Sequence, residues 1–209
     1  MKILFVTDKV VDRLYSSYVR QMFDENVSLL VSCGDLPYYY LDYLQSMLNV
    51  SLLYVHGNHD VREAQSNGRD TISEPLGGVN LHQRVVFEKG LLFAGLEGSI
   101  RYRPRAKYQY SQRDMWMMAL RLAPKLWFNK QQHGRYLDVF VTHSPAFGIH
   151  NGPDRAHVGF HAFMWLLRTF KPRYMIHGHR HVYNRQEVTK TVYEETTILN
   201  VYPYQALDM

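Results

Sequence analysis

Three histidines, His177, His179 and His181, lie within five residues at the end of an apolar stretch that predicts a buried strand. Side chains on alternate residues of an extended segment point the same way, so His179 and His181 are expected to reach one site. Gly178 between them allows the close backbone approach of a loop at a strand end. Because imidazole nitrogens bind divalent first-row metals, the run predicts a metal site. His177, which ends the strand, is assigned to the core.

Polar side chains also follow the other apolar, strand-like runs of the chain. Asp8, Asp35 and His143 each come after such a run, and so do the Asn-His-Asp residues at 58–60. In α/β sheets, ligand sites form beyond the carboxyl ends of the strands, so these side chains converge if the strands are neighbours. Carboxylates, an amide and imidazoles together suit Mn²⁺, Fe²⁺ or Zn²⁺ better than Ca²⁺, which prefers oxygen ligands. One carboxylate can bridge two ions about 3.5–4 Å apart, the arrangement for in-line displacement at phosphorus.

The hydrophobic pattern places these residues between strands and helices that alternate over the first sixty positions. This β-α-β-α-β order is typical of a mostly parallel sheet, which assigns the chain to the α/β class. Strands are expected at residues 2–7, 28–32, 52–56, 84–88, 91–95, 137–142, 174–177, 182–188 and 191–201. Helices are expected at residues 12–25, 38–48, 112–122 and 160–170, and loops at 61–78 and 97–110.

The motifs, taken in order, resemble the calcineurin-like metallophosphoesterase family. The family pattern is DxH, GD, GNHD, H and GHxH. The counterparts here run from position 8 to position 181 and are Asp8-Lys9-Val10, Gly34-Asp35, Gly57-Asn58-His59-Asp60, His143 and Gly178-His179-Arg180-His181. GNHD and GHxH together at the ends of predicted strands are a specific signal. The resemblance implies a single domain over residues 1–209 with an α/β (α+β) fold, a four-layer αββα sandwich of two mixed β-sheets flanked by helices.

The resemblance also implies a dinuclear metal centre. Asp35 would bridge two divalent ions, and Asp8 and His181 would bind the first of them. The second ion would be held by a group of three residues, namely Asn58, His143 and His179. Mn²⁺ is the expected metal, with Fe²⁺, Zn²⁺ or Mg²⁺ as alternatives.

Two further residues of the resemblance would act on the substrate, which is expected to be a phosphate ester. His59 would steady the phosphoryl oxygens or protonate the leaving oxygen, and Asp60 would orient the His59 ring. A metal-held hydroxide would attack phosphorus, since metal binding makes water a nucleophile near neutral pH. The place of His59 favours a phosphodiesterase over a phosphomonoesterase.

The chain departs from the family pattern at Val10, where the family has a histidine ligand of the first metal. Three outcomes stay open: an extra water at a weaker site, a substitute ligand, or loss of one metal and of activity. We favour the first, because three protein ligands with an open position are normal for a catalytic metal. The candidates for a substitute are Asp12, His150, Asp154 and His157.

Basic residues are concentrated in a proposed insert at about residues 97–135. Nine lysines and arginines lie between Arg101 and Arg135 against one acidic residue, Asp114, in a chain whose net charge is +5. Three tyrosines interleave with the first of them. This segment is interpreted as an anion-binding loop at the mouth of the metal site, as a nucleic-acid groove using arginine and stacking aromatics, or as a solvated surface. The predicted substrate-binding residues are Arg101, His150, Asp154 and His157.

The composition limits the other possibilities. The single cysteine, Cys33, excludes an intrachain disulfide and a thiolate-only metal site, and it favours a reducing compartment, so a cytoplasmic location is expected. No stretch approaches the roughly 20 apolar residues of a membrane span, and the apolar start of the chain is too short for a signal peptide. The oligomeric state is left open.

Three function classes therefore stand after the sequence alone. The leading hypothesis is a metal-dependent phosphoesterase that hydrolyses phosphodiesters. The second is a catalytically weak or inactive relative that acts as a binding scaffold, for which Val10 is the reason. The third is a nucleic-acid phosphoesterase that uses the basic segment.

Overall fold

The first of two large sheets is mostly parallel. Its strands, in spatial order, are β15 (Tyr204–Asp208), β1 (Lys2–Val6), β2 (Val27–Ser32), β3 (Ser51–Tyr54) and β6 (Val79–Asn80). Only β15 runs antiparallel to its neighbour among these strands. Ile3 and Phe5 of β1 pack between the two sheets, and Leu4 and Val6 pack on the opposite face. Burial on both faces explains why the strand is apolar throughout.

The second sheet has a parallel centre and antiparallel edges. Its strands, in spatial order, are β13 (Lys190–Tyr193), β14 (Thr196–Asn200), β12 (Tyr174–His177), β11 (Val139–Thr142), β8 (Leu91–Leu96) and β7 (Val85–Glu88). The edge strands β13 and β7 run antiparallel to β14 and β8. Val139 and Val141 face the first sheet, whereas Phe140 faces the helices outside.

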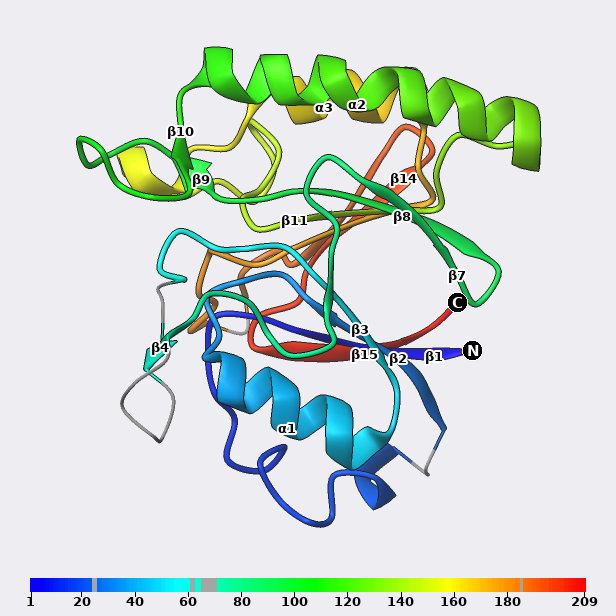
Figure 1. The fold of residues 1–209 in the computed structure, drawn as a ribbon. Coiled ribbons are helices and arrows are strands. Elements are labelled where there is room, and N and C mark those ends of the chain that lie inside the picture. The colour runs from blue at the N-terminus through cyan, green and yellow to red at the C-terminus, as the bar shows by residue number, and fades with distance from the viewer. Residues whose placement is uncertain (24–25, 61–62, 65–70, 185) are drawn as a thin grey trace.

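Helices cover the outer faces of both sheets, which confirms the predicted four-layer sandwich (Figure 1). α1 (Tyr38–Leu48) lies on the first sheet, and α2 (Gln112–His133) and α3 (His161–Phe170) lie on the second. The computed structural model describes residues 1–23, 26–60, 63–64, 71–184 and 186–209. None of the helices in these ranges is both long and apolar enough to span a membrane.

α2 extends eleven residues beyond its predicted end at residue 122. A capping box starts it, since the Ser111 hydroxyl accepts from the Asp114 N–H and the Asp114 carboxylate accepts from the Ser111 N–H. The helix then continues through Pro124, a residue that lacks the backbone N–H of a helix interior. Ala123 and Leu126 are buried against the second sheet on either side of this proline, and their packing outweighs the lost backbone hydrogen bond.

Two predicted elements are wrong. The helix expected at 12–25 is a series of turns ending in the short 3₁₀ helix η1 (Gln21–Phe23), and residues 24–25 lie outside the described residues. The buried side chains of this segment are Leu14, Val19 and Phe23, which are five and four residues apart. At that spacing the three side chains would not lie on one face of a helix. The strand expected at 182–188 has no regular structure in its described residues, and the one expected at 191–201 divides between β13 and β14.

The two expected loops contain short strands. Residues 97–110 hold β9 (Ser99–Ile100) and β10 (Gln109–Tyr110), which pair in parallel. Within 61–78, β4 (Glu63–Ala64) pairs with β5 (Thr71–Ile72), while residues 61–62 and 65–70 lie outside the described residues. A second 3₁₀ turn, η2 (Arg155–His157), follows β11.

Candidate metal centre

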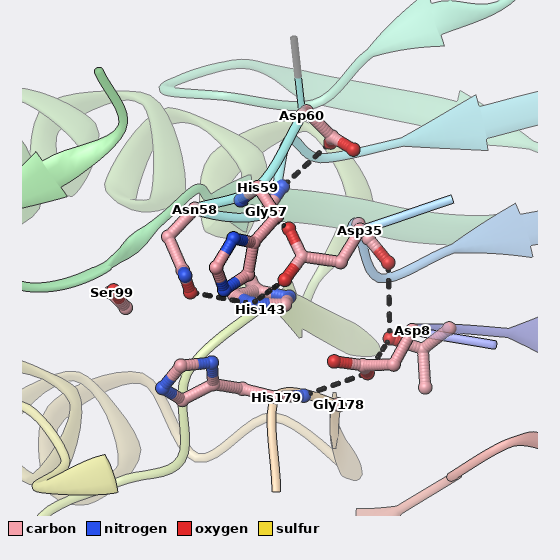
Figure 2. Close-up of polar contacts among 12 residues, drawn as sticks. Asp8, Asp35, Gly57, Asn58, His59, Asp60, Ser99, His143, Gly178 and His179 are labelled. Atoms are coloured by element: carbon pink, nitrogen blue, oxygen red, sulfur yellow. Dashed lines mark hydrogen bonds and ion pairs between the residues drawn. The ribbon is translucent and has the colours of Figure 1, made fainter. Parts of the chain in front are cut away.

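The carboxyl ends of strands from both sheets meet at one edge of the sandwich, and the motif residues gather there (Figure 2). Asp8 follows β1, Asp35 follows β2 and Asn58 follows β3, all from the first sheet. His143 follows β11 and His179 follows β12 of the second sheet. The expected convergence of side chains at strand ends is therefore present, and it lies between the two sheets.

Unusual backbone conformations aim these side chains. Asp8, Asp35 and His179 have φ values of 60°, 57° and 64°, in the left-handed region that residues with a Cβ rarely adopt. A left-handed non-glycine residue costs on the order of 1–3 kcal/mol and concentrates at functional sites. Gly57 and Gly178 let the neighbouring loops approach, since a Cβ at Gly57 would clash with the Asp35 carboxylate and one at Gly178 with Thr7.

His143 is the most constrained of the predicted ligands. Its side chain is fully buried, and its Nδ1 lies 2.8 Å from the carbonyl oxygen of Cys33. A carbonyl oxygen only accepts, so Nδ1 carries the proton and donates it there. The other nitrogen, Nε2, lies 3.0 Å from Asn58 Oδ1 and 3.3 Å from Asp35 Oδ2. In a neutral ring, Nε2 is an acceptor and would face two oxygens that are acceptors too. A positive charge between Nε2 and these oxygens is needed to stabilise the arrangement.

These separations fit a shared metal ion. Ligands about 2.1 Å from one ion and at right angles to each other are about 3 Å apart, close to the distances around His143 Nε2. Asp35, His143 and His179 each present a ligand atom within 4.8 Å of the others. A backbone carbonyl that fixes the second ring nitrogen is the usual support for a histidine ligand. The residues present therefore fit a divalent metal held by Asp35, Asn58, His143 and His179.

The charges agree with this ligand set. Burial would raise the pKa of Asp35, but His143 lowers it to about 2, so the carboxylate stays ionised. Burial lowers the pKa of His179 to about 3, which keeps this imidazole neutral. Burial would also lower the pKa of His143, but the Asp35 charge raises it to about 9. In the absence of a metal ion, His143 Nε2 therefore carries a second proton where the ion would bind. Metal ligands bind in the ionised carboxylate and neutral imidazole forms.

The half of the site around Asp8 and His181 is more open. Asp8 Oδ1 lies 3.4 Å from His181 Nε2, and Asp8 Oδ2 accepts from the His179 N–H at 2.9 Å. The Asp8 side chain is 2% exposed, whereas that of His181 is 42% exposed. The His181 ring stacks on Tyr202 with a centroid distance of 4.6 Å, and its Nδ1 lies 2.8 Å from the Tyr183 hydroxyl. Val10 packs against the apolar cluster beneath the first sheet.

The residues considered as substitutes for the missing ligand are placed in different ways. Asp154 caps η2 and its carboxylate lies 2.7 Å from His157 Nδ1; both residues line a pocket of about 290 Å³ with His181. His150 bonds to His177 at 2.9 Å and to Thr191 at 2.9 Å instead. Asp12 is exposed. The group of converging ligand atoms found among the described residues includes none of these four side chains.

The two residues expected to act on the substrate also lie at this edge. His59 is exposed, and its backbone N–H donates to Asp35 Oδ1 at 2.6 Å. Asp60 is buried and accepts from the Gly57 N–H at 2.7 Å, so it shapes the loop that carries Asn58. Burial, reinforced by the Asp35 charge, raises the pKa of Asp60 to about 6. Orientation of the His59 ring by Asp60 stays a prediction.

One supporting residue was missed by the sequence analysis. Asn58 Nδ2 donates to the Tyr102 hydroxyl at 3.2 Å, which turns Asn58 Oδ1 toward His143. The only signal for this role was the tyrosine interleaved with arginines in the basic segment. Its neighbour Arg101, predicted to bind substrate, forms an ion pair with Asp114 at 3.1 Å and donates to the Gln109 carbonyl.

Comparison with known proteins places this site in a family. The sequence model of the calcineurin-like phosphoesterases matches residues 1–183. The solved structure of TT1561 from Thermus thermophilus is 18% identical over 96% of this chain and 88% of its own, with a TM-score of 0.64. Another solved structure is 14% identical over 99% of this chain and 94% of its own, with a TM-score of 0.66. These likenesses concern the fold alone.

More distant neighbours add little. Vps29 from Entamoeba histolytica is 14% identical over 96% of this chain and 73% of its own, and its TM-score of 0.42 carries no argument about function. Comparison with curated proteins finds no significant match. The family match, by contrast, covers all the motifs whose side chains meet between the two sheets. On this ground the chain belongs to the calcineurin-like phosphoesterase family.

Proposed function

We propose that the protein hydrolyses phosphodiesters with the help of two divalent metal ions, Mn²⁺ foremost, in the cytoplasm. The observation that carries the proposal is the arrangement at His143, whose Nε2 faces the oxygens of Asn58 and Asp35 at 3.0 and 3.3 Å. Such an arrangement is stabilised by a second proton or by a metal ion, and membership of the calcineurin-like phosphoesterase family supports the metal ion.

The side chains divide the work between them. Asp35, which lies next to His143 Nε2, would contact both ions. Asn58, His143 and His179 would hold one ion, and Asp8 and His181 the other. When bound, divalent ions neutralise phosphoryl charge and lower the pKa of water, which makes it a nucleophile near neutral pH.

His59 gives the proposal its preference for diesters. Its side chain is exposed at the rim of the site while its backbone N–H is fixed on Asp35. An imidazole in that place can hydrogen-bond to a phosphoryl oxygen and donate a proton to the departing alkoxide. A diester has a leaving alcohol that needs such a proton.

Hydrolysis of bis(p-nitrophenyl) phosphate, compared with p-nitrophenyl phosphate, tests the proposal. Protein freed of metal is titrated with Mn²⁺, Fe²⁺, Zn²⁺ and Mg²⁺ in turn, and release of p-nitrophenol is followed. The diester is expected to be the better substrate, and both Asp35→Asn and His179→Ala are expected to abolish its hydrolysis. Absence of hydrolysis with every metal, in protein whose circular dichroism shows it folded, contradicts the proposal.

One observation favours a second candidate, a scaffold without activity. Val10 packs on the apolar cluster where the family has a ligand, and His181 is half exposed. Metal analysis separates the two candidates, because an enzyme retains close to two ions per chain and a scaffold retains none. A nucleic-acid substrate stays a prediction of the basic segment, and salt-sensitive binding to single strands tests it.

A further inference from the structure

A pocket of about 510 Å³ opens beside the metal centre, between the loop that carries His59 and the segment 102–109. Ligand pockets in proteins commonly measure about 300–1,000 Å³, so it can hold part of a substrate. One wall is formed by residues 58–60 of the metal-binding loop. The other wall is formed by Tyr102, Arg103, Ala106, Lys107 and Gln109.

Hydrogen bonds fix the second wall in place. The buried Gln109 side chain accepts, through Oε1, from the N–H of Tyr102 at 3.2 Å and from the N–H of Arg103 at 3.0 Å. The Tyr108 carbonyl accepts from the Ser99 N–H at 3.0 Å. The hydroxyl of Tyr102 bonds to Asn58, so the wall is tied directly to a predicted metal ligand. The backbone that carries Arg103 is therefore held beside the metal centre.

Two cations of this wall are available to a ligand. Arg103 and Lys107 are exposed, and their contacts are with the faces of Tyr102 and Tyr108, at 5.5 and 4.3 Å from the ring centroids. Among the residues that the structure describes, neither forms an ion pair with a carboxylate, in contrast to Arg101, which pairs with Asp114. Guanidinium and ammonium groups placed together bind phosphate with charge-assisted hydrogen bonds.

We propose that Arg103 and Lys107 bind a second phosphate group of the substrate in this pocket, while the scissile phosphodiester lies at the metal centre. The inference rests on the proposed function and names its substrate class, a diester that carries a further phosphate. A simple diester has one negative charge, which the ions of the metal centre would neutralise. Cations set to one side of that centre add most to affinity when a second anionic group of the substrate reaches them.

Two dinucleotides that differ by one phosphate test the substrate class. ApA and its 5′-phosphorylated form, pApA, are incubated with the Mn²⁺-loaded protein, and the products are separated by chromatography. Cleavage of either consumes one water and breaks one P–O bond of the internucleotide phosphate, and the 5′-phosphate of pApA is retained. We expect kcat/KM to be about tenfold higher for pApA, as two charge-assisted contacts would give.

Variants assign the preference to the pocket. Arg103→Ala and Lys107→Ala are each expected to lower the pApA to ApA ratio about threefold or more, with little change for ApA. Arg113→Ala is the matched control, because Arg113 is an exposed arginine of the same basic segment that does not line the pocket. Equal efficiency toward the two dinucleotides, or an equal loss in the Arg113 variant, overturns the inference and leaves the proposed function intact.

A binding measurement separates the inference from catalysis. In the presence of a chelator nothing is hydrolysed, and calorimetry is expected to give about fivefold tighter binding of pApA than of ApA, a difference lost in Arg103→Ala. Failure to cleave pApA by protein that hydrolyses bis(p-nitrophenyl) phosphate, or equal affinities of the metal-free protein for the two dinucleotides, contradicts the inference. Failure to cleave all three diesters contradicts the proposed function.

Discussion

The two halves of the candidate metal centre would share Asp35, but they differ in how their other predicted ligands are held. On one side His143 is fully buried and His179 is 5% exposed, and each follows a central strand of the second sheet. On the other side His181 is 42% exposed and belongs to a segment without regular structure, and the expected third ligand is Val10. The ligands of the buried half are therefore already in position for an ion. In the open half, the ion would have to order His181, and water would have to fill the place of the missing ligand.

The difference has a cause in the fold. His143 and His179 are packed between the sheets, where the carbonyl oxygens of Cys33 and Ala156 each lie 2.8 Å from a ring nitrogen. His181 is instead supported by two tyrosines, Tyr183 and Tyr202, at the surface. Ligands positioned by buried contacts lose less freedom on binding, so the two ions are expected to bind with unequal affinity.

The largest effect is expected from replacing Asp35, the residue that both halves would share. Asp35→Asn takes away the bridging charge and leaves His143 Nε2 facing amide atoms, so both ions are expected to dissociate more readily. We expect diester hydrolysis to fall by about 10³-fold or more and metal content to fall at both positions. Retention of two ions per chain by this variant would break the assignment of Asp35 as the bridge.

A more selective change strengthens the open half alone. Val10→His introduces the ligand that the family has there, and we expect the weaker of the two Mn²⁺ dissociation constants to fall about tenfold, with the tighter one unchanged. Val10→Ala is the control, because it removes the same apolar contact without adding a ligand. Equal effects of the two variants, measured by calorimetric titration, would show that Val10 lies away from the metal.

Two histidines beside the centre, His177 and His181, are expected to affect stability with opposite dependence on pH in metal-free protein. Burial lowers the pKa of His177, the last residue of β12, to about 3. The unfolded chain then binds more protons than the folded one as pH falls below about 6.5, so stability is lost toward acid. We expect His177→Gln to reduce this loss by up to about 1.4 kcal/mol per pH unit between pH 6 and pH 4, measured by urea unfolding.

His181 supplies the contrast. Its hydrogen bond with Asp8 raises its pKa above the ordinary value of 6.5. Its contribution is therefore fully present below that value and is lost as pH rises through the folded-state pKa. His181→Gln should lower stability at pH 5 more than at pH 8, and the same direction of change in both histidine variants would contradict the comparison.

The smallest expected effect concerns the support of a single ligand. Tyr102→Phe removes only the hydroxyl that accepts from Asn58 Nδ2, so the amide is less well oriented toward His143. We expect Mn²⁺ affinity of the tighter site to fall about three- to tenfold. Tyr183→Phe is the matched change in the open half and should weaken the other ion instead.

The motif residues could be placed from the sequence because each stands where an apolar run ends. Carboxyl ends of neighbouring parallel strands meet at one edge of a sheet, so the approach of Asp8 and Asp35 could be expected once their strands are neighbours, whereas His143 follows a strand of the other sheet. The burial of His177 also follows from its place in a strand. The helix predicted at residues 12–25 failed because the side chains that pack on the sheet, Leu14, Val19 and Phe23, do not share one helical face, so these residues form turns.

The supports of the site depend on contacts that no local pattern contains. Tyr102 contacts Asn58 across 44 positions of the chain. The side chain of Gln109 accepts hydrogen bonds from the backbone N–H groups of Tyr102 and Arg103 and so shapes that segment. The continuation of α2 through Pro124 likewise depends on burial of Ala123 and Leu126. Tertiary packing overrides local preference at each of these points.

Titration of metal-free protein with Mn²⁺, followed by calorimetry and checked by elemental analysis, is the clearest test of whether two ions bind with unequal affinity. We expect two ions per chain, with dissociation constants that differ by about tenfold or more and with the weaker one sensitive to His181→Ala. Two ions of equal affinity, or no bound ion in folded protein, would contradict it.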